Sequence, residues 1–220
     1  IRRSPAALML PAKHKLILPA PEVLRHFSED LSDLVGSART LAPTIWLDDR
    51  ARTAAAAITP DAAPVLLIAP GGNSAAKRWP HERFAAVARR LATGALSGAR
   101  IVVLSAATRD DDIAARIVSS LDADGVPASG AGPDLLAAAA LAERATLCIG
   151  NDNALTHIAA AMGAPTLTLF GPTDERVRAP RGPRARTLRG KSFEEAALDE
   201  GAAMDDISID AVEAAALYLL

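Results

Sequence analysis

The chain has 220 residues, half of them hydrophobic, and its 24 basic and 26 acidic side chains give a formal net charge of −2. This balance argues against an avid nucleic-acid binder, which needs a basic surface. Cys148 is the only cysteine, so an internal disulfide framework is excluded. No apolar run approaches the length of a membrane span. The length suits one globular domain with an appended segment.

The first 60 residues carry weaker structural signals than the rest of the chain. Apolar residues at helical spacing, followed by Gly36, predict the first helix. The elements predicted here are a helix over residues 21–34, a short strand over residues 44–47 and a small helix over residues 49–57. A Thr-Pro-Asp turn at residues 59–61 is the predicted domain boundary.

Beyond this turn, predicted strands and helices alternate regularly. The predicted strands cover residues 65–69, 100–105, 146–150 and 165–170. The predicted helices cover residues 80–91, 133–142, 153–162 and 210–219, with another starting near residue 109. Such alternation predicts an α/β fold, in which helices cover both faces of a parallel sheet. Ligands of such sheets bind beyond the carboxyl ends of the strands.

Two strand-to-helix junctions are typical of anion sites. The first reads Ala-Pro-Gly-Gly-Asn-Ser-Ala-Ala-Lys-Arg-Trp-Pro over residues 69–80, and the second reads Gly-Asn-Asp-Asn-Ala-Leu-Thr-His over residues 150–157. Backbone N–H groups at such a junction converge on one point and favour an anion. His157 lies one helical turn beyond Asn153, on the same face. Two such turns indicate a diphosphate held between them, as in a nucleotide-sugar site.

Several side chains of the first junction have two interpretations. Lys77 is either an ordinary exposed lysine or a point charge that neutralises a diphosphate, and its place in a Gly-Gly turn favours the second. Arg78 could instead pair only with a surface carboxylate. Trp79 is expected to pack at the start of the next helix.

The second junction and the nearby acidic residues are also ambiguous. Asp152 is expected to cap its helix, because a free carboxylate would repel phosphate. Thr156 either offers its hydroxyl to phosphate or bonds back within the helix. His157 is either a core histidine or a ligand-binding group. Asp110 or Asp111, just past a strand end, is a candidate to accept hydrogen bonds from a ribose.

Motifs for several other functions are missing. Ala76 and Arg78 flank Lys77 where a Walker A loop requires glycine and serine or threonine. The G-x-G-x-x-G fingerprint of dinucleotide-binding proteins is absent, which argues against a nicotinamide cofactor. Aspartates at residues 110–112 and 122–124 have D-x-D spacing but no further metal ligand nearby. No metal and no cofactor is therefore assigned.

The two junctions resemble those of the bacterial heptosyltransferases of glycosyltransferase family 9, which build the lipopolysaccharide inner core from ADP-heptose. The motifs that carry the resemblance lie, in the family's order, at residues 70–84, 150–152, 157–165 and 170–174. The resemblance implies the GT-B fold, in which two Rossmann-like domains face each other across a cleft. Residues 61–220 would form the nucleotide-sugar-binding domain. Residues 1–60 would be a remnant of the N-terminal, acceptor-side domain and the linker, with most of that domain missing.

The resemblance also implies an activity and a set of site residues. The reaction would be an inverting, metal-independent transfer of a heptose or related sugar from ADP-heptose to a lipopolysaccharide core or other glycan acceptor. The enzyme would be cytoplasmic, with at most peripheral contact at the inner face of the inner membrane. The general base would lie in the N-terminal domain, so no catalytic residue is assigned. The residues implied around the donor diphosphate are Lys77, Asp152, Asn153, Ala154 and His157. Further candidate donor contacts are Gly71, Gly72, Arg78, Asp110, Asp111 and Thr156.

Two departures from the family pattern bear on function: the motif at residues 152–154 differs, which affects donor affinity or choice, and most of the N-terminal domain is missing, which leaves a non-catalytic function open. The family commonly carries Asp-Ser/Thr-Gly where this chain has Asp-Asn-Ala over residues 152–154, which places a methyl group where backbone approaches phosphate. One alternative is a non-catalytic module that binds a nucleotide sugar. Another is a GT-B nucleotide-sugar epimerase, which would release free nucleotide without an acceptor.

Overall fold

The computed structural model describes residues 24–105, 108–196 and 203–220 as one α/β domain with an N-terminal appendage. The strands are β1 (Val65–Ala69), β2 (Arg100–Leu104), β3 (Ala128–Ala131), β4 (Leu147–Asn151), β5 (Thr166–Leu169) and β6 (Ala185–Leu188). The longer helices are α1 (Phe27–Leu34), α2 (Asp49–Ile58), α3 (His81–Thr93), α4 (Thr108–Ala123), α5 (Leu135–Glu143), α6 (Ala154–Ala161) and α9 (Ile209–Leu219). Shorter ones are the 3-10 helix η2 (Ala75–Lys77), α7 (Glu175–Arg178) and α8 (Phe193–Ala196).

The six strands form one parallel sheet in the order β3-β2-β1-β4-β5-β6. The order reverses between β1 and β4, which lie side by side in the middle of the sheet. Ala69, the last residue of β1, is in register with Gly150 near the end of β4. The turns after these two strands therefore leave the sheet next to each other, at the place where doubly wound folds bind ligands.

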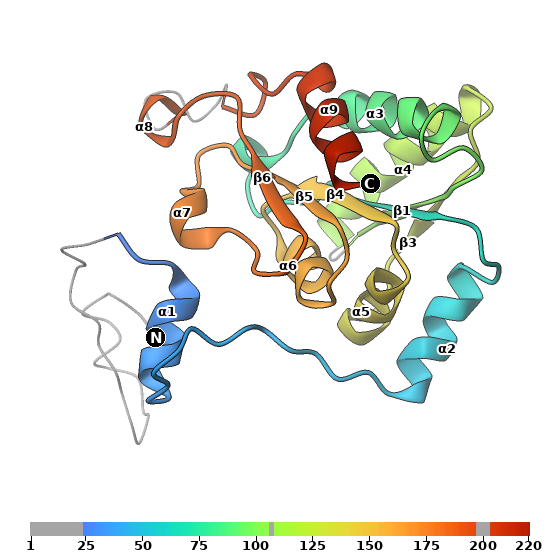
Figure 1. The fold of residues 1–220 in the computed structure, drawn as a ribbon. Helices are drawn as coiled ribbons and strands as arrows, with labels where there is room; N and C mark the ends of the chain where they lie inside the picture. The colour runs from blue at the N-terminus through green and yellow to red at the C-terminus, as the bar shows by residue number, and fades with distance from the viewer. Residues whose placement is uncertain (1–23, 106–107, 197–202) are drawn as a thin grey trace.

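Helices cover both faces of the sheet (Figure 1). Leu66 and Ile68 of β1 pack with α3, α4 and α9, whereas the alternate residues Val65 and Leu67 pack with α2, α5 and α6. Successive side chains of a strand point to opposite faces, so a strand buried on both sides is apolar throughout. The expected parallel sheet with helices on both faces is confirmed.

Two predicted elements differ from the structure, and two observed strands were not predicted. Residues 44–47 are extended but pair with no strand among the described residues, and Trp46 is 82% exposed. The first helix begins at Phe27 rather than at residue 21, and residues 21–23 lie outside the described ones. The sequence also gave no indication of β3 or β6, the two edge strands, because neither has a run of β-branched residues.

The described part of the N-terminal appendage, residues 24–58, follows the outside of the domain (Figure 1). After α1, the chain runs extended beneath the α5 and α6 side of the sheet to α2, which packs against α5. None of the described helices is both long and apolar enough to cross a membrane.

Candidate functional site

The two anion-site candidates meet at the switch point of the sheet. The first is the β1 turn, residues 70–77, and the second is the β4 turn, residues 151–154. They follow neighbouring strands, so their backbones approach closely. A Cβ atom on Gly150 would lie 2.5 Å from the carbonyl oxygen of Ala69, a distance that excludes any other residue there without a backbone shift.

Asn151 joins the two turns from inside the protein. Its side chain is fully buried, and its Nδ2 donates to the carbonyl oxygen of Pro70 (2.6 Å), while its Oδ1 accepts from the backbone N–H of Trp79 (3.1 Å). Trp79 itself packs edge-on against Phe84, which confirms its expected packing role. Asn151 was not among the predicted site residues, and its bonds between the two turns were not predicted. A polar residue at the end of the apolar strand β4 was the signal that could have revealed them.

Asn153, and not Asp152, caps helix α6. Its Oδ1 accepts from the backbone N–H groups of Leu155 (2.8 Å) and Thr156 (3.3 Å). Its Nδ2 donates to the carbonyl oxygens of Ala69 (2.9 Å) and Gly71 (3.0 Å) in the β1 turn. The expectation that Asp152 caps the helix is wrong, because the backbone of Asn153 is the one with extended, N-cap geometry.

Thr156 and Ala154 complete the first turn of α6 in different ways. Thr156 is buried, and its hydroxyl donates to the carbonyl oxygens of Asn151 (3.0 Å) and Asn153 (2.9 Å), so of its two interpretations the bond within the turn is the one observed. Ala154 is exposed. The side chain of Asn153 occupies the backbone N–H groups of Leu155 and Thr156. Among the described residues in the first turn of α6, the backbone N–H of Ala154 therefore remains available to a ligand.

Lys77, Asp152 and His157 form a charged cluster across the two turns. The Nζ of Lys77 donates to Oδ2 of Asp152 (3.1 Å), and Nε2 of His157 lies 3.6 Å from its Oδ1. Burial opposes ionisation of Asp152, but its hydrogen bonds to His157 and Lys77 outweigh burial and lower its pKa. Asp152 is therefore an anion that orients the Lys77 ammonium, which keeps further N–H donors for a ligand.

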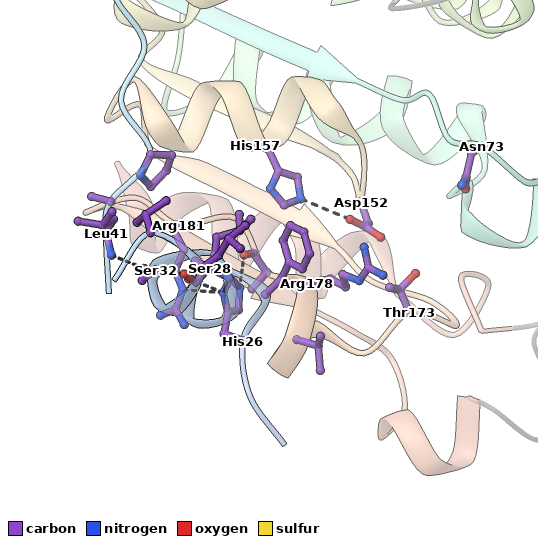
Figure 2. Close-up of a pocket in the computed structure, with 18 of the residues that line it drawn as sticks. His26, Ser28, Ser32, Leu41, Asn73, Asp152, His157, Thr173, Arg178 and Arg181 are labelled. Carbon is purple, nitrogen blue, oxygen red and sulfur yellow. Dashed lines mark hydrogen bonds and ion pairs between the residues drawn. The ribbon is translucent and has the colours of Figure 1, made fainter. Parts of the chain in front are cut away.

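A cavity of about 730 Å³ opens beside this cluster (Figure 2). Asn73, Lys77, Asp152 and His157 line one part of it. The opposite part is an apolar wall made by α1 and residues 41–43, which are far from the turns in sequence. The other lining residues that reach it from α7 and beyond are Val177, Arg178, Ala179 and Arg181, with Thr173 before that helix. His157 is 45% exposed at this cavity and is not a core histidine.

His26 ties α1 to the loop after α7, a contact that no sequence signal indicated. Its Nδ1 accepts from the backbone N–H of Ser28 (3.1 Å) and from Nε of Arg181 (3.1 Å). Its Nε2 therefore carries the proton and donates to the carbonyl oxygen of Ala179 (2.8 Å). Burial lowers the pKa of His26; the bond to Ala179 opposes this change and the charge of Arg181 adds to it.

The remaining candidates lie behind the β1 turn or beside it. Gly71 and Gly72 are buried. Arg78 donates to the carbonyl oxygen of Gly72 and lies 3.6 Å from the carboxylate of Asp110, which is 4% exposed. The carboxylate that Arg78 pairs with is thus buried and not on the surface. Asp111, in contrast, is exposed and lines a second cavity of about 430 Å³ at the carboxyl ends of β2 and β3.

A model of glycosyltransferase family 9 (heptosyltransferase) matches residues 13–207, most of the chain. The chain belongs to glycosyltransferase family 9. It is 30% identical over 131 residues to lipooligosaccharide heptosyltransferase 2 of Haemophilus influenzae, a match that covers 57% of this chain and 36% of that protein. The chain thus matches about a third of the length of this curated relative.

Solved structures of family 9 proteins share the fold. Escherichia coli ADP-heptose lipopolysaccharide heptosyltransferase II matches with a TM-score of 0.70 and 23% identity, over 83% of this chain and 54% of that one. The family 9 glycosyl transferase of Veillonella parvula matches with a TM-score of 0.72 and 21% identity, over 90% and 61% of the two chains. These matches confirm the expected fold class.

Within family 9, the Asp-Asn-Ala sequence of the β4 turn has a structural explanation. A serine or threonine at residue 153 could cap α6 but would lack the amide donor that Asn153 places on the carbonyl oxygens of Ala69 and Gly71. The asparagine therefore adds a bond between the two turns. Ala154 is exposed, and its φ angle is not positive, so the backbone at this position does not require glycine.

Proposed function

We propose that this chain is the nucleotide-sugar-binding part of a family 9 glycosyltransferase, with ADP-heptose as donor and a lipopolysaccharide core as acceptor. Residues 61–220 would hold the donor, and residues 1–60 would belong to the acceptor side and the linker. The observation that carries the proposal is the Lys77–Asp152 pair, set between two turns at the switch point and open to a large cavity. The name of the matching E. coli protein, ADP-heptose heptosyltransferase, supports this donor.

The diphosphate of the donor would lie between the two turns. The ammonium of Lys77 and the backbone N–H of Ala154 would donate to its oxygens, with His157 at the exposed side. Asp152 would keep the ammonium in place rather than contact phosphate. Asp111, at the second cavity, stays a candidate for the ribose of the nucleotide. Thr156 and Asn153 would support the turns without touching the donor.

The reaction would proceed by attack of an acceptor hydroxyl on the anomeric carbon of the sugar. The bond from that carbon to the diphosphate oxygen breaks, and its electron pair leaves with the nucleoside diphosphate. Lys77 and the turn N–H groups would stabilise the charge that develops on the leaving oxygen. The base that takes the proton of the hydroxyl would come from the acceptor-side domain. The enzyme would work in the cytoplasm.

Calorimetric titration of this chain with ADP, UDP and GDP tests the proposal. We expect selective ADP binding, weakened in Lys77→Ala by roughly 1.5–3 kcal/mol because a charged hydrogen bond is lost. Lys191→Ala is the matched control, since Lys191 is ion-paired to Asp206 away from the cavity, and its affinity should match the wild type. Equal ADP affinity in the wild type and Lys77→Ala would contradict the site. A transfer assay with ADP-heptose then tests the reaction.

A further inference from the structure

The guanidinium of Arg78 turns inward, toward the β1 turn. Its Nε and Nη2 both donate to the carbonyl oxygen of Gly72, at 3.0 and 2.8 Å. Its side chain is only 26% exposed and does not line the cavity that Asn73 and Lys77 share. This two-pronged donation uses the planar fork that arginine has and lysine lacks.

Asp110, in the first turn of α4, braces the same turn from behind. Its carboxylate lies 3.6 Å from Nη2 of Arg78. A Cβ atom on Gly71 would lie 2.4 Å from Oδ2 of Asp110, so the carboxylate is packed directly against the turn backbone. A carboxylate this deeply buried needs charged or hydrogen-bonding partners, and Arg78 is one of them. The ion pair therefore links α4 to the β1 turn.

Four consecutive carbonyl oxygens of this region are held by side-chain donors. Asn153 holds that of Ala69, Asn151 holds that of Pro70, Asn153 also holds that of Gly71, and Arg78 holds that of Gly72. A trans peptide is planar, so its N–H points opposite to its C=O. With the Gly72 oxygen fixed on Arg78, the N–H of Asn73 points away from Arg78. Asn73 is exposed and lines the same cavity as Asp152 (Figure 2).

We propose that Arg78 and Asp110 are positioning residues that fix the Gly72–Asn73 peptide, so that the Asn73 N–H is presented to the donor diphosphate. Neither side chain contacts the donor. This inference rests on the proposed function, because it needs a diphosphate in the cavity. It replaces the expectations that Arg78 contacts the donor and that Asp110 accepts bonds from its ribose.

ADP titration of Arg78→Gln, Asp110→Asn and the double variant tests the proposal. Each single change frees the peptide, so each should weaken ADP binding about tenfold, and the double variant should be no weaker than the worse single one. Asp110→Asn distinguishes a positioning role of Asp110 from a purely electrostatic effect of its charge on ADP binding. Removing an anion near a phosphate site would otherwise tighten ADP binding, so tighter or unchanged binding in this variant overturns the proposal. Additive losses in the double variant also overturn it.

A matched control is the exposed ion pair of Arg89 in α3 with Asp124 just after α4. Arg89→Gln and Asp124→Asn should leave ADP affinity within about twofold of the wild type. Peptide-resolved hydrogen exchange checks for generic destabilisation. Faster exchange should be confined to residues 70–78, and a uniform rise across the sheet would overturn the proposal. If Arg78→Gln does not fold, Arg78→Lys replaces it. Lysine keeps the positive charge beside Asp110 but lacks the planar guanidinium that makes two hydrogen bonds, so the loss of ADP affinity should be smaller than tenfold.

The result also separates this inference from the proposed function. If the wild type does not bind ADP, or binds it independently of Lys77, the proposed function fails. If binding depends on Lys77 but not on Arg78 and Asp110, only the positioning role fails.

Discussion

The two sides of the large cavity are built in different ways. On the turn side, side chains of buried or half-buried residues, Asn151, Asn153 and Arg78, hold the backbone through hydrogen bonds. On the other side, α1 and residues 41–43 present exposed apolar side chains, and His26 is the main polar link to the domain. The sheet thus prebuilds the phosphate side of the site, whereas the apolar wall is attached to it by a few contacts. Rigidity should follow the same division.

The two tryptophans give the sharpest test of this comparison. Trp79 is 1% exposed and belongs to the core beneath the β1 turn, whereas Trp46 is 82% exposed in the extended segment. Trp79→Ala should lower the free energy of unfolding by about 3–5 kcal/mol, because it leaves a cavity in the core. Trp46→Ala should change it by less than about 0.5 kcal/mol. Urea denaturation measures both, and similar losses would mean that the segment is packed as firmly as the core.

Two asparagines of the turn side provide the next test. Asn151→Ala leaves the buried carbonyl oxygen of Pro70 and the buried N–H of Trp79 without these hydrogen bonds. The change should lower the free energy of unfolding by about 3 kcal/mol. Asn73→Ala removes an exposed side chain from the neighbouring turn and should cost less than about 0.5 kcal/mol. Thermal unfolding compares the pair. A small loss for Asn151→Ala would show that water enters the joint between the turns.

The link of the apolar wall through His26 should depend on pH. Because the folded state lowers the pKa of His26 below its ordinary 6.5, the unfolded chain takes up the proton first as the pH falls. The stability that neutral His26 contributes is therefore complete above about pH 6.5 and is lost as the pH falls through the lowered value. We expect His26→Gln to cost about 1 kcal/mol at neutral pH. Chemical denaturation over a pH series should show that the difference in free energy of unfolding between wild type and His26→Gln becomes smaller as the pH falls. A difference that does not change with pH would contradict the prediction.

The sequence predicted the central sheet because its strands are continuous apolar runs between amphipathic helices. It also placed both turns correctly at the carboxyl edge, since both follow buried strands. The edge strands β3 and β6 escaped prediction because their residues face neighbours on one side only and need no β-branched run. Residues 44–47 have the opposite property, a strand-like composition without a strand to pair with.

The site residues were predicted as a group, but not their partners. Residues 151–153 are all able to cap a helix, and only the backbone geometry decides that Asn153 does so. Lys77 and Asp152 are 75 residues apart in sequence, and their pairing depends on the strand order, which no local pattern contains. The contact of His26 with Arg181 spans an even longer separation. Tertiary neighbours of this kind do not follow from periodicity or propensity.

Asn151 and Asn153, which connect the two turns, are also residues that deamidation would change. Deamidation of Asn151 or Asn153 would replace an N–H donor by a carboxylate oxygen, and that oxygen would face the carbonyls of Pro70, or of Ala69 and Gly71. Contacts that now attract would become repulsive, and the added negative charge would lie next to the phosphate position. A preparation deamidated at either residue would lose nucleotide affinity together with stability, and mass spectrometry of the peptide that contains the β4 turn would show the cause.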